Sequence, residues 1–289
     1  MVQAFALMAE DAELQRVAGA DMTATPAVST MFLFFVPDIQ PFDDPRLRRA
    51  LAHGVDRDAV AAVLSPEAMV ARGGLVPPAL HGHTPEIALR HDIGLARELL
   101  EQCGHRPRFD LYAVPGTQSE RIARTVARGW SDGLGLEVGV REVTRDQLIR
   151  NDMRPDPAPV GLSGWTPGYP DPEYFLRLLL HSQAKDNYGG YASERFDDLI
   201  ERARRSRDVR QRLELFHAAD RLAVADEVAI IPLSYDRYVA YVKPWLKGWW
   251  QYGKAWSSFA ELIVDERSPR IATSSATARR SAAWKSSRR

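Results

Sequence analysis

The sequence predicts an α/β fold, and three observations lead to this prediction. Residues 109–140 follow a strand, helix, strand pattern, which is typical of parallel strands joined by a right-handed crossover helix. Residues 31–36 (MFLFFV) are continuously apolar, as in a strand that is buried on both faces. The 289 residues are 45% hydrophobic and 26% charged, which is the composition of a globular protein with one large or two smaller domains.

Two short helices are predicted to follow the apolar strand, over residues 45–64. Asp44 can cap the first helix, and Pro45 suits its first helical position. Asp56 can cap the second. The next segment, 70–91, is rich in Pro, Gly and His, and this indicates an irregular excursion.

The middle of the chain carries further helix boundaries. Asp92 caps a predicted helix that ends at Cys103, which we interpret as a small buried hydrophobe, and Gly104 closes it. A capping-box pattern at residues 117–120 opens the crossover helix, and another at 144–147 opens a short helix.

The later elements are read from the same kinds of pattern. Residues 151–159 hold three prolines and predict a linker. A helix is expected near 174–181, and Ser193 and Asp208 cap two more. Two strands, 228–233 and 235–242, are then predicted, and the aromatic cluster from Trp245 to Phe259 is interpreted as core packing of a C-terminal hairpin.

The distribution of charge argues against nucleic acid as the main partner. The formal net charge is zero, but residues 267–289 hold seven basic and no acidic residues. The body, 1–266, therefore has 31 basic and 38 acidic residues, a net charge of −7. We expect the basic tail, 267–289, to be a disordered, solvated extension.

Leader, membrane, metal and catalytic motifs are not recognisable. The first residues carry Glu10, Asp11 and Glu13 and have no basic segment, unlike a secretory leader. One cysteine excludes an internal disulfide, and His81-Gly82-His83 is weak evidence for a metal site. We find no nucleophile elbow, phosphate loop or HExxH motif. The sequence therefore favours a protein that is not an enzyme and needs no cofactor.

Residues 164–176 (GWTPGYPDPEYFL) are the most informative stretch. Three prolines exclude a regular helix or strand at its centre. Rigid aromatic surface beside carboxylates suits the binding of a small polar organic ligand. A proline-rich connector whose aromatic rings fill the edge of a core explains the pattern equally well.

The order of four segments resembles the family 5 extracellular solute-binding proteins, which are the peptide- and nickel-binding components of ABC importers. The segments are 41–58 (PFDDPRLRRAL, then VDRD), 96–105 (ARELL, then CGH), 164–176 and 187–200 (NYGGY, then FDDLI). Residues 230–233 (IIPL) follow where the family has a similar strand. The resemblance covers roughly residues 20–260.

The resemblance implies a periplasmic-binding-protein-like fold with a ligand held between two lobes. Residues 1–38 would be a remnant of the first lobe with a hinge strand, 39–230 the second lobe, and 231–266 strands returning to the first lobe. It also implies an incomplete chain, permease subunits as partners, and a periplasmic or cell-surface location. A cytoplasmic location is the alternative if the start is genuine.

The resemblance also suggests ligand-binding residues. Trp165 and Tyr169 would supply stacking surface, Asp171 would shape the loop beside the ligand, and Asn187 and Tyr191 would make polar contacts. In peptide-binding members, the residue three positions after the motif Trp is an Asp that pairs with the peptide's ammonium group. Gly168 stands at that place, so a sugar, opine or other ligand fits at least as well as a peptide.

Two other functions remain open from the sequence. Related domains occur in transcriptional regulators, so a cytoplasmic ligand sensor is one alternative. A non-functional gene fragment is the other, because half of an interlobe cleft offers a ligand one wall.

Overall fold

A computed structural model provides the structure of the protein. It describes residues 22–24, 27–64, 68–144, 146–147, 158–237, 239–241, 246–247 and 263–264. Residues 1–21, most of the linker 151–159, the aromatic cluster from Trp245 to Phe259 and the basic tail lie outside these residues.

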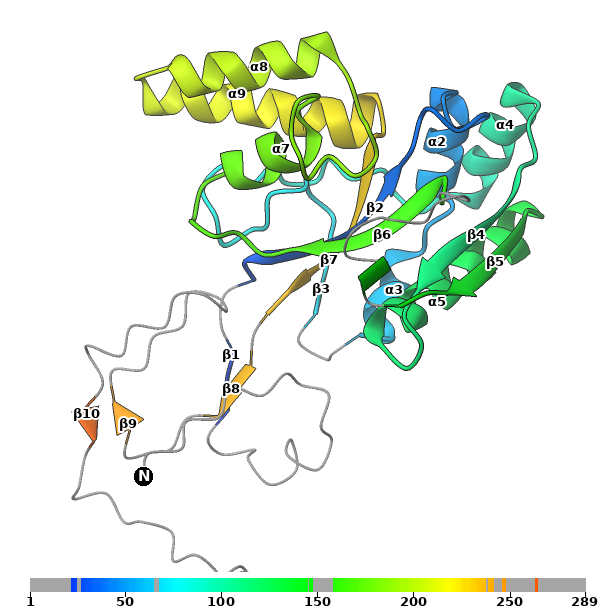
Figure 1. The fold of residues 1–289 in the computed structure, drawn as a ribbon, viewed down its shortest axis with the longest axis horizontal. Helices are drawn as coiled ribbons and strands as arrows, with labels where there is room; N and C mark the ends of the chain where they lie inside the picture. Colours follow the sequence, from blue (N-terminus) through cyan, green and yellow to red (C-terminus); the bar gives the residue numbers. More distant parts are fainter. Residues whose placement is uncertain are drawn as a thin grey trace, which may run out of the picture.

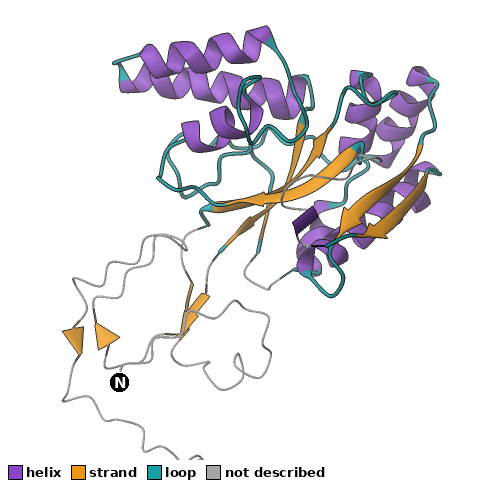
Figure 2. Ribbon diagram, in the orientation of Figure 1, coloured by secondary structure: helices purple, strands orange, loops and turns teal. Residues whose placement is uncertain are grey.

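A four-stranded antiparallel sheet organises the described chain (Figures 1 and 2). Its strands are β2 (Ser29–Phe35), β3 (Met69–Val70), β6 (Val160–Trp165) and β7 (Ile230–Asp236), in the order β3-β7-β2-β6. The apolar strand predicted at 31–36 is confirmed as β2, which pairs with β6 on one side and β7 on the other. The strand predicted to begin at Tyr235 is corrected: β7 runs on to Asp236, and the next strand, β8, spans Val239–Tyr241.

Each face of this sheet carries its own hydrophobic core. Successive side chains of a strand point to opposite faces, so Leu33 and Phe35 enter one core and Phe32 and Phe34 enter the other. The continuous apolar run of β2 is therefore explained by cover on both faces. Both β2 and β7 belong to one sheet, whereas the predicted domain division placed them in hinge and return segments; that division stays a prediction.

The first core is covered by the segment between β2 and β6. It contains helices α2 (Pro45–His53), α3 (Arg57–Ala62), α4 (Ile93–Cys103) and α5 (Gln118–Leu134), and strands β4 (Arg108–Ala113) and β5 (Glu137–Glu142). The predicted caps are confirmed: Asp44, Asp56 and Asp92 each accept a hydrogen bond from a backbone N–H of the first turn. Cys103 is buried, and Gly104 closes α4 with a left-handed backbone.

The crossover unit is confirmed, with one local correction. Strands β4 and β5 pair in parallel and are joined by α5. The side chain of Thr117 makes no capping bond to α5; it donates to Val114 O, and Glu120 accepts from Gly116 N instead. At the second box the reciprocal bonds do form, because Thr144 N donates to Gln147 Oε1 and Gln147 N donates to Thr144 Oγ1.

The second core is covered by α7 (Glu173–Leu180), α8 (Glu194–Arg205), α9 (Val209–Arg221) and the π-helical turn η1 (Leu222–Asp226). Figure 1 shows α8 and α9 side by side above α7. The predicted caps Ser193 and Asp208 are confirmed. Among the helices within the described ranges, none has the length and apolarity to cross a membrane.

A buried arginine ties the two cores together. The guanidinium of Arg48, on α2, donates to the carbonyl oxygens of Phe42, Asp43, Glu227 and Val228. Burial lowers the pKa of this guanidinium. Arg48 thus fixes the point where the chain leaves η1 and turns into β7.

Short strand pairs extend beyond one end of the sheet. Strand β1 (Met22–Ala24) pairs with β8, and β9 (Leu246–Lys247) pairs with β10 (Ile263–Val264), both antiparallel. Figure 1 places both pairs past the end at which β2 begins and β7 finishes. The chain therefore joins this body and leaves it at the same end.

Candidate functional site at the end of strand β6

The aromatic loop, residues 165–174, begins where β6 ends. Its three prolines and Gly168 interrupt regular structure until α7 starts at Glu173. Asp171 Oδ1 accepts a hydrogen bond from Glu173 N at 2.9 Å and so supports the first turn of α7. A ring at either end of this loop is therefore held by a strand or a helix.

Tyr174 connects the rings of the aromatic loop. The indole Nε1 of Trp165 donates to Tyr174 O at 2.9 Å, and the two rings lie 5.8 Å apart. Tyr169 meets the Tyr174 ring edge-on at 4.8 Å and is 45% exposed. Because the indole donor is already used, Trp165 can offer a ligand its ring surface and no hydrogen bond.

Trp165 lies at the end of the sheet where the chain joins and leaves the body. It pairs with Thr30 across β2, and Ser29, the first residue of β2, pairs with Asp236, the last of β7. The hydroxyls of Ser29 and Thr166 are 2.8 Å apart. Trp165 is half-buried against the second core, so its indole is not enclosed by aliphatic side chains on all sides.

Asp171 is committed to an ion pair. Its carboxylate receives two hydrogen bonds from the Arg212 guanidinium, at 2.9 Å and 2.7 Å. The bond to Asp171 raises the pKa of Arg212. Asp171 thus fastens the aromatic loop to α9, in agreement with the expectation that it shapes the loop.

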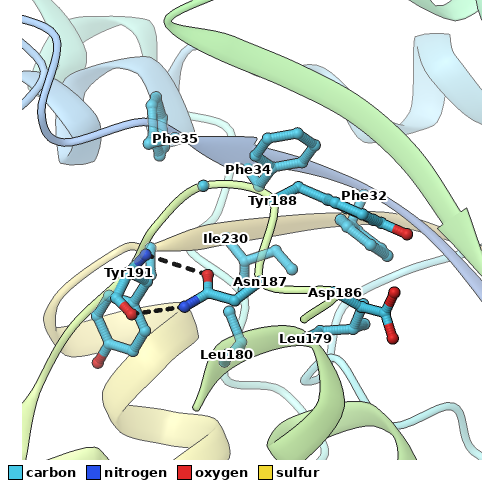
Figure 3. A pocket seen from close by; sticks show the side chains of 12 residues that line it. Phe32, Phe34, Phe35, Leu179, Leu180, Asp186, Asn187, Tyr188, Tyr191 and Ile230 are labelled. Atoms are coloured by element: carbon cyan, nitrogen blue, oxygen red, sulfur yellow. Dashed lines mark hydrogen bonds between the residues drawn. The ribbon is translucent and has the colours of Figure 1, made fainter. Parts of the chain in front are cut away.

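Asn187 and Tyr191 lie in a second loop, residues 181–193, which we call the asparagine loop. The Asn187 amide donates to the carbonyl oxygens of His181 and Tyr191 and accepts from Tyr191 N. Figure 3 shows the two bonds between Asn187 and Tyr191. The amide therefore shapes its own loop.

The Tyr191 side chain is turned inward. It is 6% exposed, and its hydroxyl donates to Glu227 at 2.6 Å. Burial, together with the carboxylate of Glu227, raises the pKa of Tyr191. The cavity beside these residues, lined by aromatic and aliphatic side chains (Figure 3), measures about 10 Å³, which is room for about one water molecule. The predicted ligand contacts of Asn187 and Tyr191 remain predictions.

A strap, residues 71–87, braces the same end of the sheet. Thr30 donates through its hydroxyl to Leu75 O, and Tyr235 donates to Gly74 O. The strap is the irregular excursion expected at 70–91, which is confirmed.

Asp220, on α9, anchors the strap through a hydrogen bond to its backbone. It is fully buried, and its Oδ1 accepts from Leu75 N at 2.8 Å. A Cβ at position 74 would lie 1.7 Å from Asp220 Oδ2, so glycine is required there. Burial raises the pKa of Asp220 to about 7. No local sequence pattern marked this carboxyl, because its partners are 145 residues away.

Two larger grooves open elsewhere on the surface. One, of about 410 Å³, lies beside β4 and is lined by Asp110, Tyr112 and Arg141 among others. The other, of about 530 Å³, lies between α7 and α8, around His181, Asp197 and Glu201. Neither groove includes Trp165 or Tyr169.

Metal chemistry finds no support within the part of the chain that the structure describes. It contains no group of three or more His, Cys, Asp or Glu side chains placed to hold an ion. His83 Nδ1 lies 2.7 Å from Val76 O, so the His81-Gly82-His83 turn uses this nitrogen to shape the strap.

Comparison with known proteins places the fold and the family. The family model of bacterial extracellular solute-binding proteins, family 5 Middle, matches residues 4–187. The dipeptide-binding protein of Escherichia coli K12 is 23% identical over 252 residues, which are 83% of this chain and 46% of that protein. The periplasmic oligopeptide-binding protein OppA of Salmonella typhimurium is 29% identical over 219 residues, 72% of this chain and 40% of that protein.

Solved structures show the same architecture. The murein tripeptide-binding protein MppA of Escherichia coli superposes with a TM-score of 0.72 at 24% identity, covering 82% of this chain and 48% of that one. DppA of Helicobacter pylori, solved with the peptide STSA, gives 0.75 at 19% identity, covering 90% and 52%. This chain thus spans about half the length of the proteins it matches. It belongs to the family 5 extracellular solute-binding proteins.

Proposed function

We propose that this chain supplies a ligand-binding lobe of the solute-binding component of an ABC importer, and that its ligands are peptides. The observation that carries the proposal is the position of Trp165. This residue lies at the end of the sheet where the chain joins and leaves the body, and its half-buried ring packs against Tyr174. A ligand held between this lobe and a second one would touch that end.

The edge of the sheet suits an extended peptide. Within the described residues, β6 has a hydrogen-bonded neighbour, β2, on one side. Backbone groups on the other side of a strand can pair with an added peptide strand, and neighbouring surface then selects its side chains. Gly164 is exposed next to Trp165, so the backbone there is accessible.

The names of related proteins favour peptides over the other ligand classes expected from the sequence. Relatives are named for dipeptide, oligopeptide and di/tripeptide binding, and others for deoxycholate, heme and glutathione. None of these is named for an opine or an oligosaccharide. The family's description as solute-binding agrees with a non-catalytic role.

Different roles are proposed for the five candidate residues. Trp165 and Tyr169 contact the ligand through their rings. Asp171, Asn187 and Tyr191 act indirectly, because their polar groups already bond to Arg212, to the asparagine loop and to Glu227. Tyr174, which ties the two contacting rings together, is added as a positioning residue.

Several parts of the proposal depend on protein beyond this lobe. They are closure of two lobes around the ligand, permease subunits as partners, and a periplasmic or cell-surface location. A cytoplasmic sensor domain is the competing proposal, and the coding sequence upstream of Met1 discriminates between them. A first lobe preceded by a leader supports import, whereas a DNA-binding region supports sensing.

Calorimetry with the full chain tests the proposal directly. The titrants are a panel of di- to pentapeptides. Oligosaccharides, deoxycholate and heme are titrated separately as representatives of the other ligand classes. We expect binding of peptides and a loss of about tenfold or more in Trp165→Ala, as for an aromatic anchor. Leu95→Ala, an exposed apolar change on α4, is the matched control. Unchanged peptide affinity in Trp165→Ala would overturn the site.

A further inference from the structure

We infer that the strap, residues 71–87, is a latch that the Asp220 carboxyl holds closed in its uncharged form. As the pH rises towards neutrality, the strap opens locally while the two cores stay folded. Only contacts inside this lobe are involved, so the behaviour of the latch does not depend on which ligand the lobe binds.

The strap is a compact loop that closes on itself. Gly74 N donates to Thr84 O at 2.8 Å, and Ala88 N, just past the strap, donates to Arg72 O at 3.0 Å. A loop whose two ends meet in this way can open as one unit while its neighbours stay in place. The contacts that the strap makes with the rest of the lobe therefore decide whether it stays closed.

The contacts from the sheet and from the aromatic loop do not change charge near neutral pH. The hydroxyls of Thr30 and Tyr235 donate to carbonyl oxygens of the strap, and burial raises the pKa of Tyr235 above its usual range. A Cβ at Gly82 would lie 2.7 Å from Cγ of Pro172, so the strap and the aromatic loop pack closely there. These contacts hold the strap equally well in acid and at neutral pH.

Asp220 supplies a contact that does depend on pH. Its side chain is fully buried, and Oδ1 accepts from Leu75 N at 2.8 Å. Oδ2 is buried and has no hydrogen-bond partner among the described residues, and a Cβ at position 74 would lie 1.7 Å from it. A carboxylate that is kept from water with one oxygen unbonded is costly. Ionisation therefore favours the open strap, in which water reaches both oxygens.

The charged groups around Asp220 do not compensate for its burial. Burial raises its pKa to about 7, against the opposing effect of nearby strap donors and of Arg221, the next residue on α9. The buried guanidinium of Arg57, on α3, donates to backbone carbonyl oxygens of β7 and of the segment after the strap. Glu86, an acid of the strap itself, is exposed.

Histidine titration at the strap would act with the opposite sign. His217 lies three residues before Asp220 on α9, and burial lowers its pKa. A lowered histidine pKa contributes stability that is lost as the pH falls. His83, on the strap, meets the Tyr235 ring edge-on at 5.6 Å, and its Nδ1 lies 2.7 Å from Val76 O. A change driven by histidine would loosen the strap in acid, whereas Asp220 loosens it towards neutral pH.

Opening of the strap affects the end of the sheet that carries Trp165. Thr30, which pairs with Trp165 across β2 and β6, loses its acceptor in the strap. Pro172, in the aromatic loop, loses its packing against Gly82. The protonation state of one carboxyl on α9 thereby controls how firmly this end of the lobe is held.

Hydrogen exchange of the full chain between about pH 5 and about pH 7 tests the latch. The protection factor, which corrects for the intrinsic pH dependence of exchange, reports how often an amide is open. We expect the protection of Leu75 N–H to fall about tenfold per pH unit, as a single ionisation requires, and to be insensitive to low urea concentrations, as for a local opening. Val126 N–H, in α5, should be at least about a hundredfold better protected throughout.

Two results in the wild type would overturn the inference. One is protection of Leu75 N–H that stays constant or rises with pH. The other is protection equal to that of Val126 N–H at every pH, because the strap then opens only when the whole lobe unfolds.

Matched variants identify the acid. Asp220→Asn keeps an acceptor for Leu75 N and gains no charge, so its protection at Leu75 should vary by less than about twofold over the same pH range. Glu86→Gln removes the exposed acid of the strap and should keep the wild-type profile. A fall that persists in Asp220→Asn, or one that disappears in Glu86→Gln, would contradict the assignment. If Asp220→Asn does not fold, the direction of the wild-type change decides, because a histidine gives a rise.

Discussion

The aromatic loop and the asparagine loop are similar in composition and differ in where their bonds lead. Both contain aromatic rings, carboxylates and turn residues, and both precede a helix of the second core. In the asparagine loop the polar groups bond inward, from Asn187 to its own backbone and from Tyr191 to Glu227. In the aromatic loop the Asp171 carboxylate bonds to Arg212 on α9, and the Tyr169 side chain stays exposed.

This difference separates groups that build a site from groups that touch a ligand. A buried, fully bonded amide costs stability when it is removed. Removal of an exposed ring costs little stability, but it weakens the binding of a ligand that contacts the ring. Changes in the asparagine loop should therefore alter folding, whereas changes in the aromatic loop should alter binding.

The buried carboxyl of Asp220, which anchors the strap, gives the largest expected effect, on the pH dependence of stability. Its pKa is raised from 3.8 to about 7 in the folded protein. A raised carboxyl pKa contributes stability that is complete below pH 4 and is lost as pH rises through 7. The shift corresponds to a decline of about 4 kcal/mol in the free energy of unfolding.

Asp220→Asn tests this pH dependence. The amide keeps an acceptor for Leu75 N and stays neutral at all pH values. We therefore expect the variant's free energy of unfolding to show little of that decline between pH 4 and pH 8. The measurement is urea unfolding across this range. Parallel pH profiles for the wild type and the variant would contradict the assignment.

Asn187→Ala gives the next largest effect. Three hydrogen bonds of the asparagine loop disappear, and we expect a loss of about 2–3 kcal/mol in the free energy of unfolding. Gln183→Ala, an exposed change in the same loop, is the control and should stay within about 0.5 kcal/mol. Peptide affinity of the folded fraction should be unchanged, and a tenfold loss would place Asn187 at the ligand.

Tyr191→Phe removes one buried hydrogen bond, and we expect a loss of about 1–2 kcal/mol. Because the pKa of Tyr191 is raised in the folded state, the phenol's contribution is present below pH 10 and is lost as pH rises further. The variant should therefore lose less stability than the wild type between pH 9 and pH 11. Denaturant unfolding at these pH values measures the difference, and equal losses would contradict it.

Tyr169→Ala should have the smallest effect on stability, within about 0.5 kcal/mol, because its side chain is 45% exposed and lies at the surface of the loop. Its effect on peptide affinity should be a loss of about threefold to tenfold, from the lost ring contact. Val209→Ala, at the exposed start of α9, provides a matched surface control. A stability loss above 2 kcal/mol with unchanged affinity would make Tyr169 a packing residue.

Local chemistry in the sequence predicted much of the fold. Helix starts at Asp44, Asp56, Asp92, Ser193 and Asp208 were predicted because a capping side chain bonds within its own first turn. The strand at 31–36 was predicted because two-sided burial leaves a continuous apolar run. Thr117 departed from its pattern: its hydroxyl donates to Val114 O, and its oxygen accepts no bond from a backbone N–H of the first turn of α5.

The long-range partners of the candidate site could not be predicted. Asp171 meets Arg212 41 residues later, and Tyr191 meets Glu227 36 residues later. No spacing rule links such pairs, since the sheet and the two cores bring them together. Tyr174 was within the aromatic stretch, but its role depends on its carbonyl oxygen and on the positions of the Trp165 and Tyr169 rings around it, which the spacing of residues does not fix.

A peptide that lies against the Trp165 ring should shift the indole N–H resonance of that residue, and this shift is the most direct test of the proposed site. The chain has seven tryptophans, so six other indoles serve as internal references in a ¹H–¹⁵N spectrum, and Trp165→Phe assigns the signal by its loss. On titration with a peptide that calorimetry shows to bind, we expect the Trp165 signal to shift in step with saturation. A Trp165 signal that stays in place while other indoles shift would contradict it.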